Sequence, residues 1–289
     1  MRDPARRGLE SGGRGGLEPR WRSRVIPFFF DPPDEELFGI HHPPAAGGAR
    51  GWGVVLCGPW GYEALVLHRV LFQLATRLAA SGFHVLRFDY FGTGDSAGSV
   101  EVGELRRWTR DVSRAADELQ ARAGVRKICL VGARLGAALA ARAGAARGDL
   151  DGLVLWDPVL RGKDHIEALH TEHRRMLRTA HVVPEDAGAK SGQTELVGFA
   201  FPDRLRQELD RLDLFEIPRL PAREVLLVTS ASSRSDAPFR ERLEALGARV
   251  AHRTFPESGV WRWQEDLGRA RVPPQLIEGI VHWIEESAP

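Results

Sequence analysis

The chain has 289 residues, of which 43% are hydrophobic and 27% charged, and its formal net charge is +1. This length suffices for one large domain with a full hydrophobic core. A near-neutral chain has no global field that would recruit nucleic acid, and no apolar run approaches the roughly 20 residues of a membrane span. Cys57 and Cys129 both lie inside apolar stretches. This predicts reduced, buried thiols in a cytoplasmic protein rather than a disulfide framework.

Residues 1–24 are rich in arginine and glycine and contain no apolar stretch of the kind found in secretory signals. Such a composition cannot bury enough apolar surface to offset the entropy lost on ordering. We expect a disordered tail, solvated rather than anion-binding.

From residue 25 onward, short apolar runs alternate with amphipathic stretches. Residues 25–30 and 36–42 predict an opening hairpin, and residues 51–58 predict a strand buried on both faces. Leucines at helical spacing predict a helix that ends at Ser81 and Gly82. Later strands are predicted over 84–90, 127–133, 152–158, 224–230 and 249–255, with helices over 105–119, 134–147, 239–246 and 277–284.

Repeated strand–helix units predict an α/β fold with a mostly parallel sheet that helices cover on both faces. The alternation lapses between Asp157 and Pro221, where charged, helix-like pieces occur instead. A long insertion after a strand is typical of a lid or cap. The predicted organisation is therefore a tail over 1–24, an α/β core over 25–157 and 221–289, and a cap over 158–220.

Three stretches, in this order and at this spacing, resemble the α/β-hydrolase fold. "LCGPWGYE" (56–63) resembles the loop that supplies an oxyanion-hole N–H. "FDYFGTGDSAG" (88–98) is similar to the Asp/Gly/Ser turn after the fourth strand, and "VGARLGAALA" (131–140) resembles the nucleophile elbow. The resemblance covers residues 25–286 and implies an α/β-hydrolase fold that includes a cap insertion.

A narrower resemblance rests on "PFFF", "LFGIHHPP", "HVLRFDYFGTGDS", "GARLG" and "LVLWDPV". Together they are similar to the hydrolase-like proteins associated with exosortase A systems, some of which carry arginine in the elbow. That resemblance implies a bacterial, cytoplasmic protein whose gene lies near exopolysaccharide and protein-sorting loci. It implies no settled substrate.

Arg134 stands where the elbow requires serine, between Gly132 and Gly136. A guanidinium stays protonated and has no nucleophilic lone pair, but it holds carboxylates or phosphates by two parallel N–H bonds. Two interpretations are open: an anion clamp at the floor of a pocket, or an internal ion pair that plugs an inactive site. For the internal pair the available carboxylates are those of Asp157, Asp236, Glu63 and Glu257. The sequence favours the two aspartates, because both follow strand ends that should face this pocket.

The other triad positions are only partly filled. Asp236 follows the strand 224–230 in the register of the catalytic acid. The loop after the strand 249–255 contains no histidine, and Val260 or Trp261 stands near the expected place. Without serine and histidine the acyl-enzyme route has no first step. The backbone N–H groups of Trp60 and Leu135 are the predicted remnant of an oxyanion hole.

Several other residues are candidates for the pocket. Trp60, Glu63 and Trp261 are predicted to line it, although the tryptophans suit a core equally well and Glu63, at a helix start, suits solvent. Asp157 is more readily a counter-ion for Arg134 than an aspartyl nucleophile, and Cys57 is expected in the core. Four histidines lie in the predicted cap: His165, His170, His173 and His181. Their spacing suits no metal site, and neither a metal nor another cofactor is predicted.

Three functions remain open from the sequence. The first is a hydrolase-like protein that binds a small acyl or carboxylate ligand without standard serine hydrolysis. The second is an active ester or acyl hydrolase, or a transferase, with a non-standard nucleophile. The third is a non-catalytic scaffold in an envelope-polysaccharide or sorting pathway, whose protein partner the sequence does not indicate.

Overall fold

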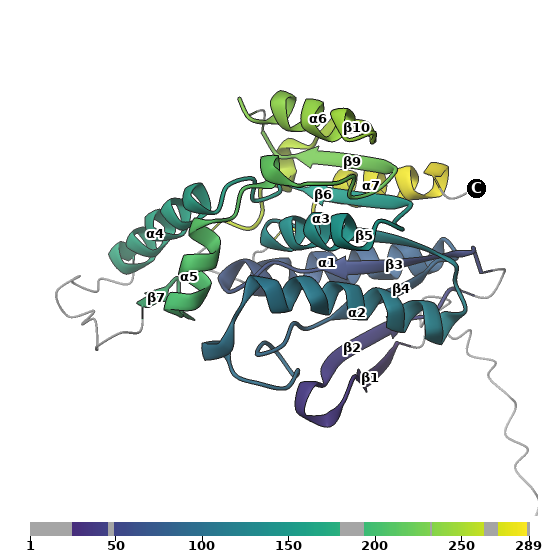
Figure 1. The fold of residues 1–289 in the computed structure, drawn as a ribbon, viewed down its shortest axis with the longest axis horizontal. Helices are drawn as coiled ribbons and strands as arrows, with labels where there is room; N and C mark the ends of the chain where they lie inside the picture. Colours follow the sequence, from purple (N-terminus) through teal and green to yellow (C-terminus); the bar gives the residue numbers. More distant parts are fainter. Residues whose placement is uncertain (1–24, 46–48, 180–193, 232, 263–270, 288–289) are drawn as a thin grey trace, which may run out of the picture.

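The computed structural model describes residues 25–45, 49–179, 194–231, 233–262 and 271–287. The predicted tail therefore lies outside the described residues. An eight-stranded sheet in the order β1-β2-β4-β3-β5-β6-β9-β10 forms the centre of the molecule (Figure 1). From β4 to β10 all neighbouring strands pair in parallel, and β1 and β2 add an antiparallel edge.

The strands form where the sequence predicts them. The opening hairpin joins β1 (Ile26–Phe30) to β2 (Leu37–His42). Two central strands are β3 (Trp52–Cys57) and β6 (Gly152–Trp156). Every residue of both is buried, because helices cover both faces of the sheet. The remaining strands of the sheet are β4 (His84–Phe88), β5 (Lys127–Ala133), β9 (Glu224–Thr229) and β10 (Arg249–Thr254).

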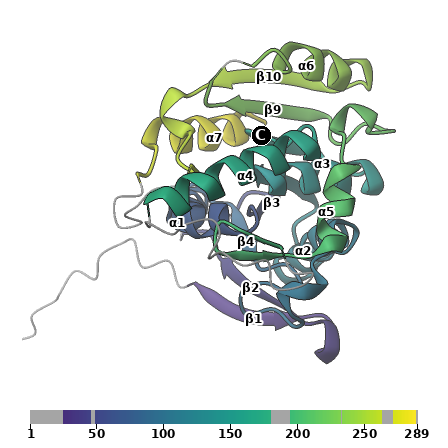
Figure 2. The ribbon, with the colours of Figure 1, turned by 90° about the vertical axis from the view of Figure 1, so that its left-hand side faces the viewer.

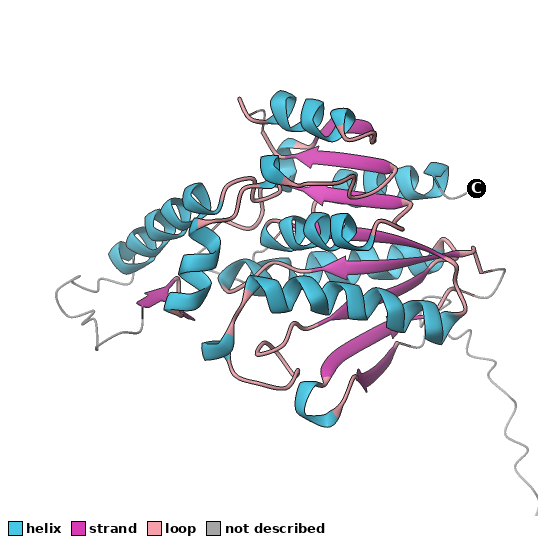
Figure 3. Cartoon of the chain, viewed as in Figure 1, coloured by secondary structure: helices cyan, strands magenta, loops and turns pink. Residues whose placement is uncertain are grey.

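Helices pack on both faces of the sheet, as predicted (Figure 3). One face is covered by α1 (Tyr62–Ala80) and α7 (Pro274–Ser287), which contact each other. The other face carries α2 (Leu105–Ala123), α3 (Leu135–Arg147) and α6 (Asp236–Ala245). Each face has its own buried apolar cluster, so the sheet separates two hydrophobic cores.

The inserted segment between β6 and β9 lies beyond the carboxyl ends of the parallel strands, where Figure 2 shows it facing the viewer. It comprises α4 (Gly162–Thr179), a hairpin of β7 (Thr194–Leu196) and β8 (Phe199–Phe201), and α5 (Asp203–Asp210). The helices correspond to the charged pieces seen in the sequence, whereas the hairpin was not predicted. Among the described helices, none combines the length and apolarity needed to cross a bilayer.

Candidate functional site

A sharp turn between β5 and α3 presents residue 134. Arg134 has φ 56° and ψ −121°, a conformation that costs a non-glycine residue about 1–3 kcal/mol. A Cβ on Gly132 would collide with the backbone of Ala137, and one on Gly136 would collide with the carbonyl oxygens of Cys57 and Gly58. Both glycines are therefore required, as predicted, because the start of α3 lies too close to Gly132, and the end of β3 too close to Gly136, to admit a side chain.

The Arg134 side chain is held on three sides. Its Nε donates to Oε1 of Glu63 at 3.0 Å, and one terminal nitrogen donates to the backbone carbonyl of Asp157 at 2.9 Å. The guanidinium carbon lies 4.7 Å from the centre of the Trp261 ring, within the range of a cation–π interaction. Only 16% of the Arg134 side chain is exposed. The arginine is thus bound internally rather than directed into solvent.

The carboxylate that pairs with Arg134 belongs to Glu63, so the preference for Asp157 or Asp236 was wrong. The Asp157 carboxylate turns toward the end of β9, where its Oδ1 accepts from the backbone N–H and the hydroxyl of Ser230. The Asp236 carboxylate accepts from the backbone N–H of Ser233 at the start of its own helix. Both side chains are engaged locally, and Asp157 reaches Arg134 only through its carbonyl oxygen.

Glu63 is buried, which overturns the expectation of a solvated side chain. It lies in the first turn of α1, and only 6% of it is exposed. Gly61 has φ 66° at the helix start, so the chain turns sharply after the loop 58–60 and brings this turn of α1 beside the elbow. The start of a helix also favours a carboxylate because of its positive dipole end.

Burial perturbs the titratable groups around Arg134. Desolvation raises the pKa of Glu63, against the opposing effect of Arg134. Desolvation also raises the pKa of Asp157 to about 6, although the hydrogen bond from Ser230 and the charge of Arg134 act in the other direction. For His165 of α4, burial and the nearby Arg134 charge lower the pKa to about 3. His165 is therefore neutral at ordinary pH and adds no positive charge.

Three buried polar atoms near Arg134 have no hydrogen-bond partner among the described residues: Oε2 of Glu63, Oδ2 of Asp157 and Nδ1 of His165. Around the single guanidinium there are two carboxyl groups and one neutral imidazole. This balance does not suit an additional anion, which would have to approach two carboxylates in a partly buried space.

Trp261 lies in the loop after β10, where the resemblance predicts the catalytic histidine. It is buried and contacts the Trp156 ring as well as Arg134. His252 lies within β10, as predicted, and hydrogen-bonds Thr229 at the sheet edge. Cys57 is fully buried, and burial raises the pKa of its thiol, which is the reverse of what a thiolate nucleophile needs.

The loop after β3 approaches the elbow closely. The Cys57 and Gly58 carbonyls lie against the start of α3 at Gly136, and the Tyr90 hydroxyl donates to the carbonyl of Gly58 at 3.0 Å. This places the backbone of residue 60 and that of Leu135 on neighbouring segments, as the prediction of an oxyanion hole requires. Their role as an oxyanion hole stays a prediction.

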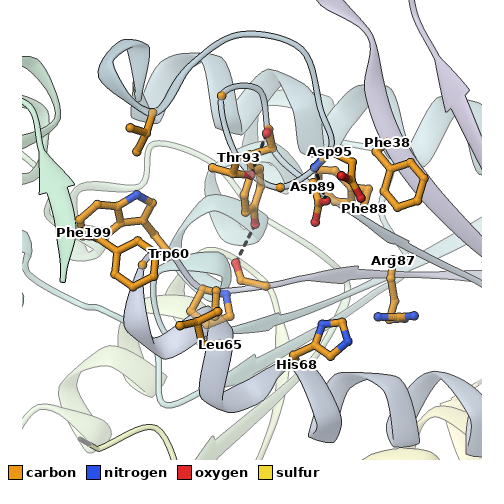
Figure 4. A pocket seen from close by; sticks show the side chains of 18 of the residues that line it. Phe38, Trp60, Leu65, His68, Arg87, Phe88, Asp89, Thr93, Asp95 and Phe199 are labelled. Atoms are coloured by element: carbon orange, nitrogen blue, oxygen red, sulfur yellow. Dashed lines mark hydrogen bonds between the residues drawn. The ribbon is translucent and has the colours of Figure 1, made fainter. Parts of the chain in front are cut away.

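A cleft of about 700 Å³ opens beside the loop 58–61, between the turn after β4 and the β7–β8 hairpin (Figure 4). Trp60 lines this cleft. Glu63, Arg134 and Trp261 are not among its lining residues, so this cleft is not the pocket that was predicted at Arg134, and the placement of these residues in a pocket stays a prediction.

The turn after β4 shapes one side of this cleft through internal hydrogen bonds. Ser96 Oγ donates to the carbonyl of Asp89 and accepts from the backbone N–H of Phe38. Gly92, Gly94 and Gly98 all have positive φ, which explains the glycine spacing noted in the sequence. Among the described residues, no group of three or more histidine, cysteine or acidic side chains is placed to hold a metal ion.

Comparison with solved structures decides the architecture. Est1E from Butyrivibrio proteoclasticus, in a structure with ferulic acid bound, aligns with a TM-score of 0.64 and 14% identity, over 90% of this chain and 98% of that one. A carboxyl esterase from Bacillus coagulans aligns with a TM-score of 0.61 and 13% identity, over 92% and 99% of the two chains. The chain has the α/β-hydrolase fold.

Other comparisons agree with this fold. Proline iminopeptidase from Mycobacterium smegmatis aligns with a TM-score of 0.59 and 13% identity, over 91% of this chain and 99% of that one. By sequence, residues 68–197 match the family described as serine aminopeptidase, S33. A search of curated proteins finds no match. The α/β-hydrolase fold is thus common to neighbours whose names include esterases and a peptidase.

Proposed function

We propose that this α/β-hydrolase-fold protein does not carry out serine hydrolysis at its elbow and instead binds a small ligand with an acyl or similar apolar body. The observation that supports this proposal is the internal binding of Arg134 by Glu63, the Asp157 carbonyl and the Trp261 ring. A residue in this position offers no hydroxyl, and a guanidinium cannot attack a carbonyl carbon.

The same contacts argue against Arg134 as a clamp for an external anion. Its Nε already faces a carboxylate, and the Asp157 carboxyl group adds a second acidic side chain nearby. The cleft beside the loop 58–61 is the better place for a ligand, since its volume lies within the range of about 300–1,000 Å³ typical of small-molecule sites.

Two assays on the purified protein test this proposal. A fluorophosphonate probe, which reacts with activated serines, should not label the protein above background. Short- and medium-chain p-nitrophenyl esters should not be turned over, and neither Arg134→Ala nor Arg134→Ser should create strong turnover, because the loop after β10 has no histidine at the position of the catalytic base. Ester hydrolysis by the wild type that Arg134→Ala abolishes would contradict the proposal and favour an active enzyme with a non-standard nucleophile.

The scaffold hypothesis is the second candidate, and the internal ion pair of Arg134 favours it. The two candidates differ in the cleft: a binding protein should take up small apolar ligands there, and a scaffold should not. The narrower assignment to a cytoplasmic, hydrolase-like protein of an exosortase A system rests on the sequence motifs alone. The genes adjacent to the coding sequence and cell fractionation test it.

A further inference from the structure

The cleft beside the loop 58–61 has an apolar end. Trp60 and Phe199 form an edge-to-face pair with ring centres 6.3 Å apart, and Figure 4 shows both on the same side of the cleft as Leu65. Leu65 is 54% exposed although it is a large apolar residue. These three side chains come from the oxyanion-type loop, α1 and the β7–β8 hairpin, and together they form a surface suited to an alkyl chain or an aromatic ring.

The cleft also has an end formed by Arg87 of β4, which is positively charged, and His68 of α1, and the two lie near each other in Figure 4. Arg87 Nε donates to Nε2 of His42 at 3.1 Å, and its guanidinium lies 5.3 Å from the Phe72 ring centre. These contacts fix the plane of the guanidinium. Its two terminal nitrogens have no acceptor within the part of the chain that the structure describes.

The acidic groups of the cleft are engaged differently. Asp89 Oδ2 accepts from the backbone N–H of Asp95 at 3.1 Å, and the absence of a side chain at Gly94 makes room for that carboxylate. Asp89 therefore holds the turn; burial raises its pKa, while the positive charge of nearby Arg87 acts in the other direction. Asp95 is exposed. The cleft's unused hydrogen-bonding capacity at its inner wall is thus that of donors on Arg87.

We propose that this cleft binds a monomeric carboxylic acid with an acyl or aryl body. The carboxylate contacts the terminal nitrogens of Arg87, with His68 beside it, and the body packs against Trp60, Leu65 and Phe199. A guanidinium held in one plane matches the two oxygens of a carboxylate. This inference rests on the proposed ligand-binding function and names its ligand class and the residue that selects it.

Binding of decanoate, decanol and decylamine, each below its micellar concentration, tests the head group, with calorimetry and quenching of tryptophan fluorescence as readouts. Decanoate should bind about 10-fold more tightly than decanol, since a charge-assisted hydrogen bond contributes about 1.5–3 kcal/mol. Arg87→Gln should abolish that preference and leave decanol binding unchanged. Arg69→Gln is the matched control, because Arg69 is exposed on the same helix as His68 and does not line the cleft.

A second variant covers the case in which Arg87→Gln does not fold. His68 is exposed, so His68→Glu keeps the fold, and its carboxylate should repel decanoate and reverse the preference in favour of decylamine. Equal binding of decanoate and decanol by the wild type, tighter binding of decylamine, or an unchanged preference in both variants would overturn the inference while leaving a binding function intact. Failure of all three probes to bind would reject the binding function as well. Ester turnover at the elbow would reject only the proposed lack of hydrolysis.

Discussion

The elbow and the cleft beside the loop 58–61 contain the same kinds of side chain in different states. At the elbow Arg134 lies against Trp261 and donates to Glu63 and to the Asp157 carbonyl. In the cleft Arg87 lies against Phe72, and among the described residues only its Nε has a hydrogen-bond partner. What a guanidinium can bind depends on the donors that the chain leaves unpaired. The position of catalysis in a hydrolase fold is therefore not the position of ligand recognition proposed here.

The largest expected effect comes from breaking the Arg134–Glu63 pair. Arg134→Ala should lower the free energy of unfolding by about 3–5 kcal/mol, because it leaves a buried carboxylate without its counter-ion. The double variant Arg134→Leu with Glu63→Leu should recover most of this loss, since two apolar residues leave no unpaired charge. Urea unfolding of the single and double variants measures both effects.

The control for this pair is Arg206→Ala on α5, where Arg206 pairs with exposed carboxylates. Its loss should cost less than about 0.5 kcal/mol. If Arg134→Ala were as mild as this control, the Arg134–Glu63 pair would not stabilise the elbow region. The proposed difference between Arg134 and Arg87 would then be contradicted.

A pH series isolates the buried Asp157. Its pKa is raised to about 6, so between pH 4 and 6 the unfolded chain releases the proton before the folded protein does. The wild type should therefore lose stability relative to Asp157→Asn as the pH rises from 4 to 7, by up to about 3 kcal/mol. Asparagine keeps an oxygen acceptor for Ser230. Urea unfolding of both proteins at several pH values between 4 and 7 measures the difference.

The comparison between the two proteins is necessary because other groups act in the opposite sense. Burial lowers the pKa of both His41 and His42 to about 4, so their contribution to stability is present above pH 6.5 and is lost as the pH falls toward 4. This contribution is common to wild type and variant and cancels in the difference. A difference that does not change with pH would show that Asp157 ionises as an ordinary solvated carboxyl group.

Gly136→Ala tests the close contact between the elbow and the end of β3. The new methyl group would meet the carbonyl oxygens of Cys57 and Gly58, and such overpacking against backbone should cost about 2–3 kcal/mol. Gly51→Ala is the matched control, because a Cβ there meets nothing within 4 Å. Equal thermal stability of the two variants would mean that the elbow and the end of β3 are not in close contact.

The smallest effect concerns the ring over Arg134. Trp261→Leu should be about 1 kcal/mol less stable than Trp261→Phe, because phenylalanine keeps an aromatic face for the guanidinium and leucine does not. Thermal unfolding of the two variants, each compared with its counterpart in an Arg134→Leu background, measures this term. A difference between leucine and phenylalanine that persists without Arg134 would assign the effect to packing instead.

Most of the fold was predictable because the central strands are continuous apolar runs and the helices have clear apolar faces. The β7–β8 hairpin was not, since its turn has positive φ at Val197 as well as at Gly198. A β-branched valine gives no turn signal in a sequence, because that conformation is unfavourable for it. The hairpin forms against the core nonetheless, with Leu196, Val197 and Phe201 buried.

The candidate site was predictable only where backbone geometry governs it. The elbow glycines follow from sterics that any such turn must obey. The partner of Arg134 depends on the direction in which α1 leaves Gly61, which a linear pattern does not contain. Arg87 did leave a signal, because "HVLRFDY" places an arginine among the apolar residues of a predicted strand, with Asp89 two positions further on. A buried charge needs a partner or a ligand, and this requirement indicates polar contacts beside β4.

The backbone turn at residue 134 makes this chain a convenient host for engineered catalysis. The chain already has the strained turn that a serine hydrolase needs to present its nucleophile. Two glycines allow this turn to pack closely against its neighbours. A redesign would be confined to replacing the side chains of Arg134, Glu63 and Trp261. Such a rebuilt protein would measure how much rate each restored group supplies relative to the unmodified chain.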